Sequence, residues 1–327
     1  MISQESKELK PKPILFVTGG TGLTGGRFVE LLGKKTLLVA PSHDEFNLLW
    51  SYPEILNFFK EVKDKYGVAF VINFAAVTDV DGSEKEKEDK GGVVWRTNVE
   101  GATSLARMCK TLGLEFVHIS TDYVFSGKRY PHKEDERSNP VDSWYAQSKV
   151  EAEEKIIDVG GKIHIVRIQM PFTHENLARK DFPRIAVERL MSGKNFAAVV
   201  DQYVTPVYVD DCAEAIFRIA HSQEYGVWHV STPTIVTPNE FAHMIVQSVR
   251  KYGLDLDESL ITETTFEEFS KNRTAVRPKD NAFDIPNGRF VAHFGKEILR
   301  PLAEMLDEWA GRFVPNLREK ERLGIYV

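Results

Sequence analysis

The sequence predicts an α/β fold, with a doubly wound parallel sheet followed by a smaller C-terminal lobe. Two observations favour this fold class. Apolar runs of strand length alternate with helical patterns through the first half of the chain. The first run, residues 14–17 (ILFV), passes through a glycine-rich turn directly into a helical pattern. A strand, a glycine turn and a helix in this order are typical of a unit that binds a dinucleotide.

The turn reads Gly19-x-x-Gly22-x-x-Gly25. Glycine lets the backbone bend sharply and approach a pyrophosphate closely, while the first N–H groups of the following helix supply an anion site. Tight packing of a helix on a strand would also favour glycine here. We expect this turn, together with Leu23 and Thr24, to bind the cofactor.

Composition excludes several functional classes. A chain of 327 residues with 42% hydrophobic residues can bury a core in one large or two smaller domains. The net charge of -6 provides no basic field for nucleic acid. No apolar stretch reaches the roughly 18 residues of a membrane span, and the N-terminus lacks a signal core. Cys109 and Cys212 lie in apolar segments, which favours reduced, buried thiols. We therefore expect a cytoplasmic protein that binds neither nucleic acid nor membrane.

Local signals define the later elements. Further strands are expected at residues 36–40, 69–73, 115–120 and 162–167. Gly33 ends the first helix, Ser51 and Glu54 form the start signature of the next, and residues 92–112 predict a long helix ended by Gly113. C-terminal helices are expected within residues 181–191, 204–220 and 238–252, with Asp210 or Asp211 capping the second.

The end of the second strand bears on the choice of cofactor. An acid about 20 residues past the glycines would bind the ribose hydroxyls of NAD. Residues 40–43 contain no acid. The extra phosphate of NADP could be met by Ser42, His43, Lys34 or Lys35, although each could be an ordinary surface residue. The sequence thus favours NADP, with NADPH bound more tightly than NADH.

Small and polar residues follow the third strand. Asn73, Ala75 and Ala76 stand where a backbone could lie against a cofactor, and the loop of residues 78–81 follows at the carboxyl edge, where doubly wound sheets bind ligands. Small residues at a strand end are also ordinary packing, and loop acids are usually solvated.

The residues best suited to chemistry follow the fourth strand. Tyr145 and Lys149 are i and i+4 on a predicted helix and so share one face. A nearby cation favours the phenolate and brings a phenol toward acid-base work at neutral pH. A hydroxyl from Thr121 or Ser120 could hold a substrate carbonyl beside Tyr145. His118 is interpreted as a core histidine, and no cluster has metal-ligand spacing, so no metal is assigned.

With these residues in view, the sequence resembles the extended short-chain dehydrogenase/reductase family, and within it the dTDP-4-dehydrorhamnose reductases. The segments TGGTGLTGG, VINFAAVTDVD, HISTDYVFSG, YAQSK and VRPKDNAFD carry the resemblance, which covers nearly the whole chain. It implies a Rossmann domain over residues 12–167, with residues 202–232 returning to it, and a substrate-binding lobe mainly over residues 168–327. It also implies NADPH-dependent reduction of a nucleotide-linked 4-keto-6-deoxy sugar.

Carried over position by position, the resemblance implies three sets of site residues. The catalytic residues would be Thr121, Tyr145 and Lys149. The cofactor contacts would be Gly19, Gly22, Leu23, Thr24, Gly25, Ser42, His43, Asn73, Ala75, Ala76, Asn98, Tyr145 and Lys149. The substrate contacts would be Thr78, Asp81, Thr121, Tyr123, Val124 and Arg277.

Two departures and two alternatives accompany this interpretation. Related 4,6-dehydratases carry an acid pair after the strand-end threonine; here Tyr123 follows Asp122, which argues against dehydration. Residues 167–171 (RIQMP) replace an aromatic and a glycine that such reductases more often show. A nucleotide-sugar epimerase would use the same residues. A non-catalytic NADP-binding subunit, similar to the methionine adenosyltransferase beta subunit, would also retain the Tyr and Lys. A homodimer is a further expectation.

Overall fold

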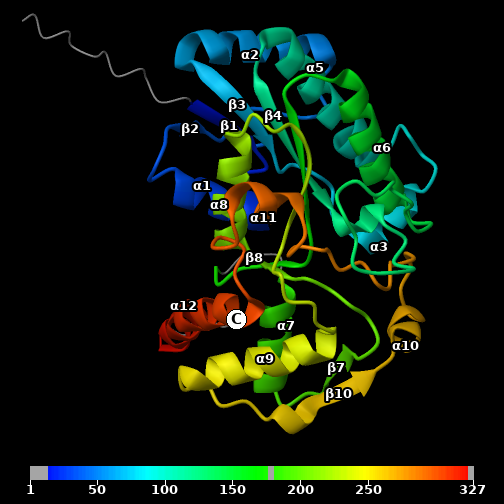
Figure 1. Ribbon diagram of the computed structural model, residues 1–327, viewed down its shortest axis with the longest axis vertical. Helices are drawn as coiled ribbons and strands as arrows, with labels where there is room; N and C mark the ends of the chain where they lie inside the picture. The colour runs from blue at the N-terminus through cyan, green and yellow to red at the C-terminus, as the bar shows by residue number, and fades with distance from the viewer. Residues whose placement is uncertain (1–13, 176–179, 323–327) are drawn as a thin grey trace, which may run out of the picture.

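The computed structural model describes residues 14–175 and 180–322. Six parallel strands form the central sheet, in the order β2-β1-β3-β4-β5-β9 (Figure 1). They are β1 (Ile14–Thr18), β2 (Leu38–Val39), β3 (Val68–Asn73), β4 (Glu115–Thr121), β5 (Ile163–Ile168) and β9 (Gly226–Val230). The strand order reverses between β1 and β3, and a ligand is expected outside the carboxyl ends at such a point. The predicted parallel α/β class is confirmed.

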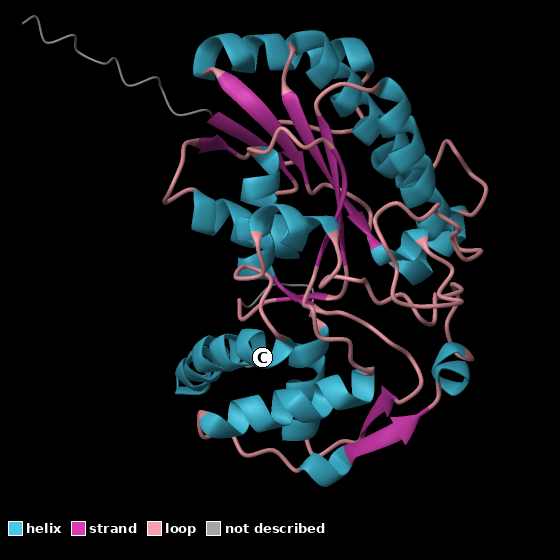
Figure 2. Cartoon of the chain, viewed as in Figure 1, coloured by secondary structure: helices cyan, strands magenta, loops and turns pink. Residues whose placement is uncertain are grey.

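Helices cover both faces of the sheet (Figure 2). On one face lie α1 (Leu23–Leu32), α8 (Val209–Ala220) and α11 (Arg289–Phe294); on the other lie α2 (Tyr52–Tyr66), α5 (Ala102–Leu112) and α6 (Trp144–Val159). Because side chains alternate along a strand, Leu15 and Val17 join the first core while Phe16 joins the second. Both faces of the sheet are buried mainly by apolar residues, as is usual for a parallel sheet covered by helices.

Most predicted helix signals are found. Glu54 accepts a hydrogen bond from the backbone of Ser51 (2.7 Å) at the start of α2, and Gly33 and Gly113 follow α1 and α5. The expected cap on α8 is wrong, because the helix begins at Val209 after Tyr208. Asp210 and Asp211 lie in its first turn, where both bind arginines.

The predicted long helix of residues 92–112 is one run with a change of pitch. It comprises α4 (Val93–Trp95), a π-helical segment η2 (Arg96–Gly101) and α5. Such segments often occur at functional positions. Two further predictions are corrected: β2 is shorter than residues 36–40, and the expected loop of residues 78–81 enters a short helix, α3 (Val80–Ser83), capped by Asp79. The segments η1 (Glu84–Glu86) and η3 (Asp122–Val124) are single 3-10 turns.

The C-terminal lobe lies below the carboxyl edge of the sheet in Figure 1. It contains α7 (Phe182–Met191), β7 (Phe196–Val199), α9 (Pro238–Lys251), η4 (Glu258–Leu260), β10 (Ile261–Thr264), α10 (Phe266–Ser270) and α12 (Leu302–Arg322). Strand β7 pairs with β10, and β6 (Pro171–Phe172) pairs with β8 (Val207–Tyr208). Phe172, Phe241 and Trp309 are fully buried in its core.

The chain returns to the sheet twice after β5. Strand β9 adds to β5, and α8 packs against α1. Phe283, Phe290 and Leu299 also belong to the core on the α1 side, so part of the segment expected in the substrate lobe packs on the sheet. The predicted domain boundaries stay a prediction. Their two outer limits, residues 12 and 327, lie outside the described residues.

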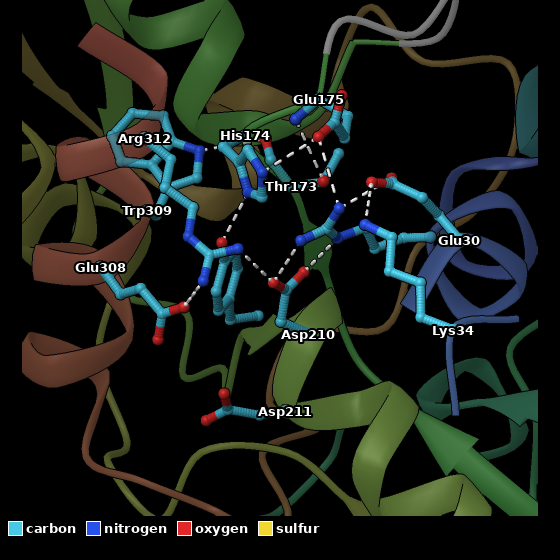
Figure 3. Close-up of polar contacts among 12 residues, drawn as sticks. Glu30, Lys34, Thr173, His174, Glu175, Asp210, Asp211, Glu308, Trp309 and Arg312 are labelled. Carbon is cyan, nitrogen blue, oxygen red and sulfur yellow. Dashed lines mark hydrogen bonds and ion pairs between the residues drawn. The ribbon is translucent and has the colours of Figure 1, made fainter. Parts of the chain in front are cut away.

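A charged network joins the two lobes (Figure 3). Arg27, on α1, binds both carboxylate oxygens of Asp210 at 2.7 Å, and Arg312, on α12, binds the same carboxylate at 3.0 Å. Beside them His174 Nδ1 lies 2.6 Å from the Tyr208 hydroxyl. The helix that begins at the glycine turn is thereby tied to the C-terminal helix.

The expectations for the two cysteines and for membrane-spanning segments can be compared with the described residues. Cys109 and Cys212 are both free and buried, as expected, and burial raises the pKa of both thiols. Within residues 14–175 and 180–322, no helix is long and apolar enough to cross a membrane.

A buried isoleucine of the C-terminal lobe and an exposed isoleucine on α6 together test the packing of the lobe. Ile245→Ala empties a fully buried position on α9 and should lower the free energy of unfolding by about 2–5 kcal/mol. Ile157→Ala, at a position on α6 that is 54% exposed, should change it by less than about 1 kcal/mol. Urea unfolding of both variants measures the difference; equal losses would contradict the assigned core.

Candidate active site

A cavity of about 560 Å³ opens at the carboxyl edge of the sheet. Its walls are the glycine turn, the exits of β3, β4 and β5, one face of α6 and the start of α7. Cavities of this size at the reversal of strand order are the usual ligand sites of such sheets. The predicted residues that line it are Gly19, Gly22, Leu23, Thr24, Gly25, Ala76, Thr78, Thr121, Tyr123, Tyr145 and Lys149.

The glycine turn is shaped by close backbone contact. Gly19 has φ +69°, and a Cβ there would lie 2.6 Å from the backbone nitrogen of Ala75. A Cβ on Gly25 would overlap the carbonyl oxygen of Gly19. Only glycine fits both positions, so the first turn of α1 can lie against the exit of β3. Because this first turn contains no acid and lines the cavity, its N–H groups suit a pyrophosphate.

Other expected cofactor residues support the wall from behind. Asn73 accepts a hydrogen bond from the Thr18 hydroxyl (2.5 Å) and also contacts His118 Nδ1 (3.1 Å). Asn98 bonds the backbone N–H and C=O of Val77 at 2.8 and 3.0 Å. Both asparagines are 1% exposed and neither lines the cavity. They fix the loop that carries Ala76 and Thr78.

Three further residues are also absent from the cavity wall. Ser42 and His43 are exposed, and the Ser42 hydroxyl donates to Glu45 at 2.9 Å. Ala75 lies behind the wall against Gly19. The cofactor contacts expected of all three stay predictions.

Lys149 and Tyr145 lie together on the α6 face that borders the cavity. Lys149 is 2% exposed and donates to the backbone oxygen of Ile119 at 2.9 Å; its Nζ also lies 3.4 Å from His118 Nε2. Burial lowers the pKa of Lys149 to about 8, although Glu153 opposes the shift. Burial and Lys149 together hold the pKa of His118 well below its ordinary value. His118 is thus a buried, neutral partner of the lysine, as predicted for a core histidine.

Polar groups next to Tyr123 pair with one another, although Asp81 and Arg277, both expected to contact substrate, do not line the cavity themselves. Arg277 binds Asp81 at 2.6 Å and lies 3.5 Å from the Tyr123 hydroxyl, while Arg273 lies 3.8 Å from Asp81. The ring of Tyr123 meets that of Tyr145 edge-on at 5.5 Å, and burial raises the pKa of Tyr123 to about 12. Val124, expected to contact substrate, does not line the cavity: its side chain is 0% exposed and packs in the apolar core.

Sequence reasoning missed part of the wall. Ile168, Met170 and Pro171 come from the exit of β5, which the carboxyl-edge rule could have indicated. Lys180, Asp181 and Phe182 reach the cavity only because α7 packs below it. Ser120, which the sequence offered as an alternative to Thr121, does line the cavity, and within the described residues its buried hydroxyl has no hydrogen-bond partner. No group of three His, Cys, Asp or Glu side chains suited to a metal is found in that part of the chain.

The fold and the site together define an extended short-chain dehydrogenase/reductase: a parallel sheet with a glycine turn, and a Tyr and Lys pair that shares the cavity with a strand-end threonine. Residues 13–308 match the family described as RmlD substrate binding domain, and the chain belongs to this family.

Relatives span most of the chain. A probable low-salt glycan biosynthesis reductase of Haloferax volcanii is 29% identical over 83% of this chain and 90% of its own. A dTDP-4-dehydrorhamnose reductase of Aggregatibacter actinomycetemcomitans is 27% identical over the same shares. The crystal structure of a dTDP-4-dehydrorhamnose reductase from Clostridium acetobutylicum superimposes with a TM-score of 0.78 at 26% identity, covering 93% of this chain and 99% of that one. The resemblance to dTDP-4-dehydrorhamnose reductases is confirmed.

A matched pair of glycines tests the turn. Gly19 and Gly67 share φ +69°, but a Cβ on Gly67 would meet nothing within 4 Å. Gly19→Ala should therefore weaken NADPH binding by about tenfold or more, because its methyl group displaces the turn from β3. Gly67→Ala should lose some stability and keep its affinity. Fluorescence titration measures both; equal affinities would contradict the role of the turn.

Burial of Lys149 also predicts a pH dependence of stability. Because its pKa falls from 10.5 to about 8 on folding, the unfolded chain binds more protons between these pH values. Stability should therefore gain from this group as pH rises from 8 to 10.5. Unfolding measured across this range should show the gain in the native protein and lose it in Lys149→Met, whereas Lys155→Met, at an exposed position of α6, should retain it.

Proposed function

We propose that this protein reduces the 4-keto group of a nucleotide-linked 4-keto-6-deoxy sugar with NADPH, in the manner of its dTDP-4-dehydrorhamnose reductase relatives. The observation that carries the proposal is the convergence of Tyr145, Lys149 and Thr121 with the glycine turn in one cavity. We further propose that it acts in deoxysugar biosynthesis in the cytoplasm, as a homodimer.

Different residues of the cavity would have separate roles in cofactor binding and in proton transfer. The glycine turn and the first N–H groups of α1 would hold the pyrophosphate. The Ser120 hydroxyl, which has no hydrogen-bond partner among the described residues, offers a further polar contact in the cavity. When bound, NADPH supplies the hydride. Tyr145 would give its proton to the keto oxygen, and the ammonium of Lys149 would favour the resulting phenolate. Thr121 would contact the same oxygen.

The polar groups next to Tyr123 suit the nucleotide diphosphate. Arg277 presents a guanidinium, which can bind two phosphate oxygens, and Tyr123 lies beside it. Asp81 now neutralises Arg277, so a diphosphate would compete with this carboxylate. Asp81 could then accept hydrogen bonds from the sugar or base.

The same geometry would serve an epimerase, and a cofactor-binding regulatory subunit would retain it. Net oxidation of NADPH by dTDP-4-dehydrorhamnose supports the reductase. Interconversion of sugar diastereomers without net oxidation would indicate the epimerase. Tight NADPH binding with no turnover of any keto sugar would indicate the regulatory role.

Substitution of Tyr145 separates chemistry from binding. Tyr145→Phe removes the proposed acid and should lower kcat by about 10²- to 10⁴-fold with little change in NADPH affinity. Lys149→Met should lower both turnover and NADPH affinity, and Thr121→Val should mainly slow turnover. Tyr66→Phe, at an exposed position, is the matched control. NADPH oxidation and direct titration give the two readouts, and a Tyr145→Phe enzyme with near-normal kcat would overturn the catalytic assignment.

A further inference from the structure

A buried polar cluster lies behind Thr121. Asp122, Gln169 and Asn281 come from the exit of β4, the exit of β5 and the segment that returns from the C-terminal lobe. Their exposed fractions are 6%, 1% and 2%. None of the roles proposed above uses this cluster.

The side-chain amide of Gln169 is fully engaged. Its Nε2 donates to Asp122 Oδ2 at 2.9 Å and to the backbone oxygen of Asn281 at 3.2 Å. Its Oε1 accepts from the backbone N–H of Thr205 and from the Thr205 hydroxyl, the latter at 2.8 Å. With two donors and two acceptors satisfied, the amide has one orientation, and its N–H must face Asp122.

The two oxygens of Asp122 therefore differ. Oδ2 accepts from Gln169 and from the side-chain N–H of Asn281, whereas Oδ1 is 2.9 Å from the Thr121 hydroxyl. Two N–H groups face Oδ2, so a proton on this carboxyl would go to Oδ1, the oxygen beside Thr121. The Asp122 proton and the Thr121 proton thus compete for one hydrogen bond.

We propose that Asp122 is a positioning residue that decides whether Thr121 donates to, or accepts from, the substrate oxygen. When Asp122 is ionised, the Thr121 hydroxyl donates to Oδ1 and offers the substrate only a lone pair, which suits a sugar alcohol. When Asp122 is protonated, its O–H donates to Thr121, and the Thr121 hydrogen can turn to a keto oxygen. This inference rests on the proposed reductase function.

Both forms of Asp122 are accessible near neutral pH. Burial raises its pKa to about 6, and the hydrogen bonds from Gln169 and Thr121 limit the rise. The titratable and charged groups that share the cavity with it are Tyr123 on η3, Tyr145 and Lys149 on α6, and Lys180 and Asp181 at the start of α7. Arg277 contacts Tyr123. Tyr123 and Lys149 keep their protons at this pH. Burial also raises the pKa of Asp181, so substitution of Asp122 itself is needed to assign the titration.

Asp122→Asn provides a direct test, because its amide can copy the protonated carboxyl. The amide oxygen would accept from Gln169 and Asn281, and its NH₂ would donate to Thr121. We expect kcat/KM for reduction of dTDP-4-dehydrorhamnose to fall above about pH 6 in the native enzyme, and this loss to vanish in Asp122→Asn. Oxidation of dTDP-rhamnose by NADP⁺ should fall about tenfold or more in the variant, because Thr121 no longer presents a lone pair.

The comparison includes a matched control. Asp255→Asn, at a carboxyl that is 87% exposed, should reproduce the native pH profile in both directions. If Asp122→Asn lowers both directions equally with an unchanged profile, its role is structural and the proposal is overturned.

A ligand-free measurement separates this proposal from the proposed function. In protein labelled with ¹³C-aspartate, the carboxyl signal that disappears in Asp122→Asn reports Asp122. Its titration midpoint should rise in Thr121→Val, which removes a hydrogen bond to the anion. An unchanged midpoint overturns the coupling. Absence of turnover by native protein, with the midpoint shifted as expected, would instead overturn the reductase function alone.

Discussion

The contact between Gly19 and the exit of β3 is the constraint on which the site depends. A Cβ at Gly19 would lie 2.6 Å from the Ala75 nitrogen. The turn after β1 can therefore pack against the exit of β3 only if residue 19 has no side chain. This contact places the first turn of α1 at the reversal of strand order. Because all six strands are parallel, the exits of β3, β4 and β5 open at the same edge. One steric requirement thereby sets the cofactor turn beside the residues proposed for chemistry.

Hydrogen bonds across long sequence distances hold that edge together. Gln169 joins the exits of β4 and β5 to Thr205 and Asn281, and Arg27 joins α1 to α8 and, through Asp210, to α12. The Gln169 amide, with both its donors and its acceptor oxygen bonded, fixes side-chain direction more tightly than apolar packing does. The direction of a single hydroxyl, that of Thr121, can therefore depend on a residue from the next strand.

Burial controls the charges of the site. It lowers the pKa of Lys149 to about 8 and raises that of Asp122 to about 6. Both shifts disfavour the charged form, and both bring a group closer to neutral pH, where proton transfer is most effective. Asp81 and Arg277, which lie next to Tyr123, form a direct ion pair at 2.6 Å. Desolvation thus sets the charge state of the two groups at the centre of the site.

The sequence alone determined the parallel α/β class, the glycine turn, and the helix that carries Tyr145 and Lys149, because these follow from local periodicity and from residue types with special backbone or chemical properties. Only the tertiary structure decided that Asn73 and Asn98 lie behind the wall, that Val124 turns into the core, and that residues 180–182 reach the cavity. The Asp122–Gln169 contact, 47 residues apart, was equally beyond local patterns. Such facts depend on which segments meet in space, and a hydrogen bond between distant side chains leaves no periodic signal in one sequence.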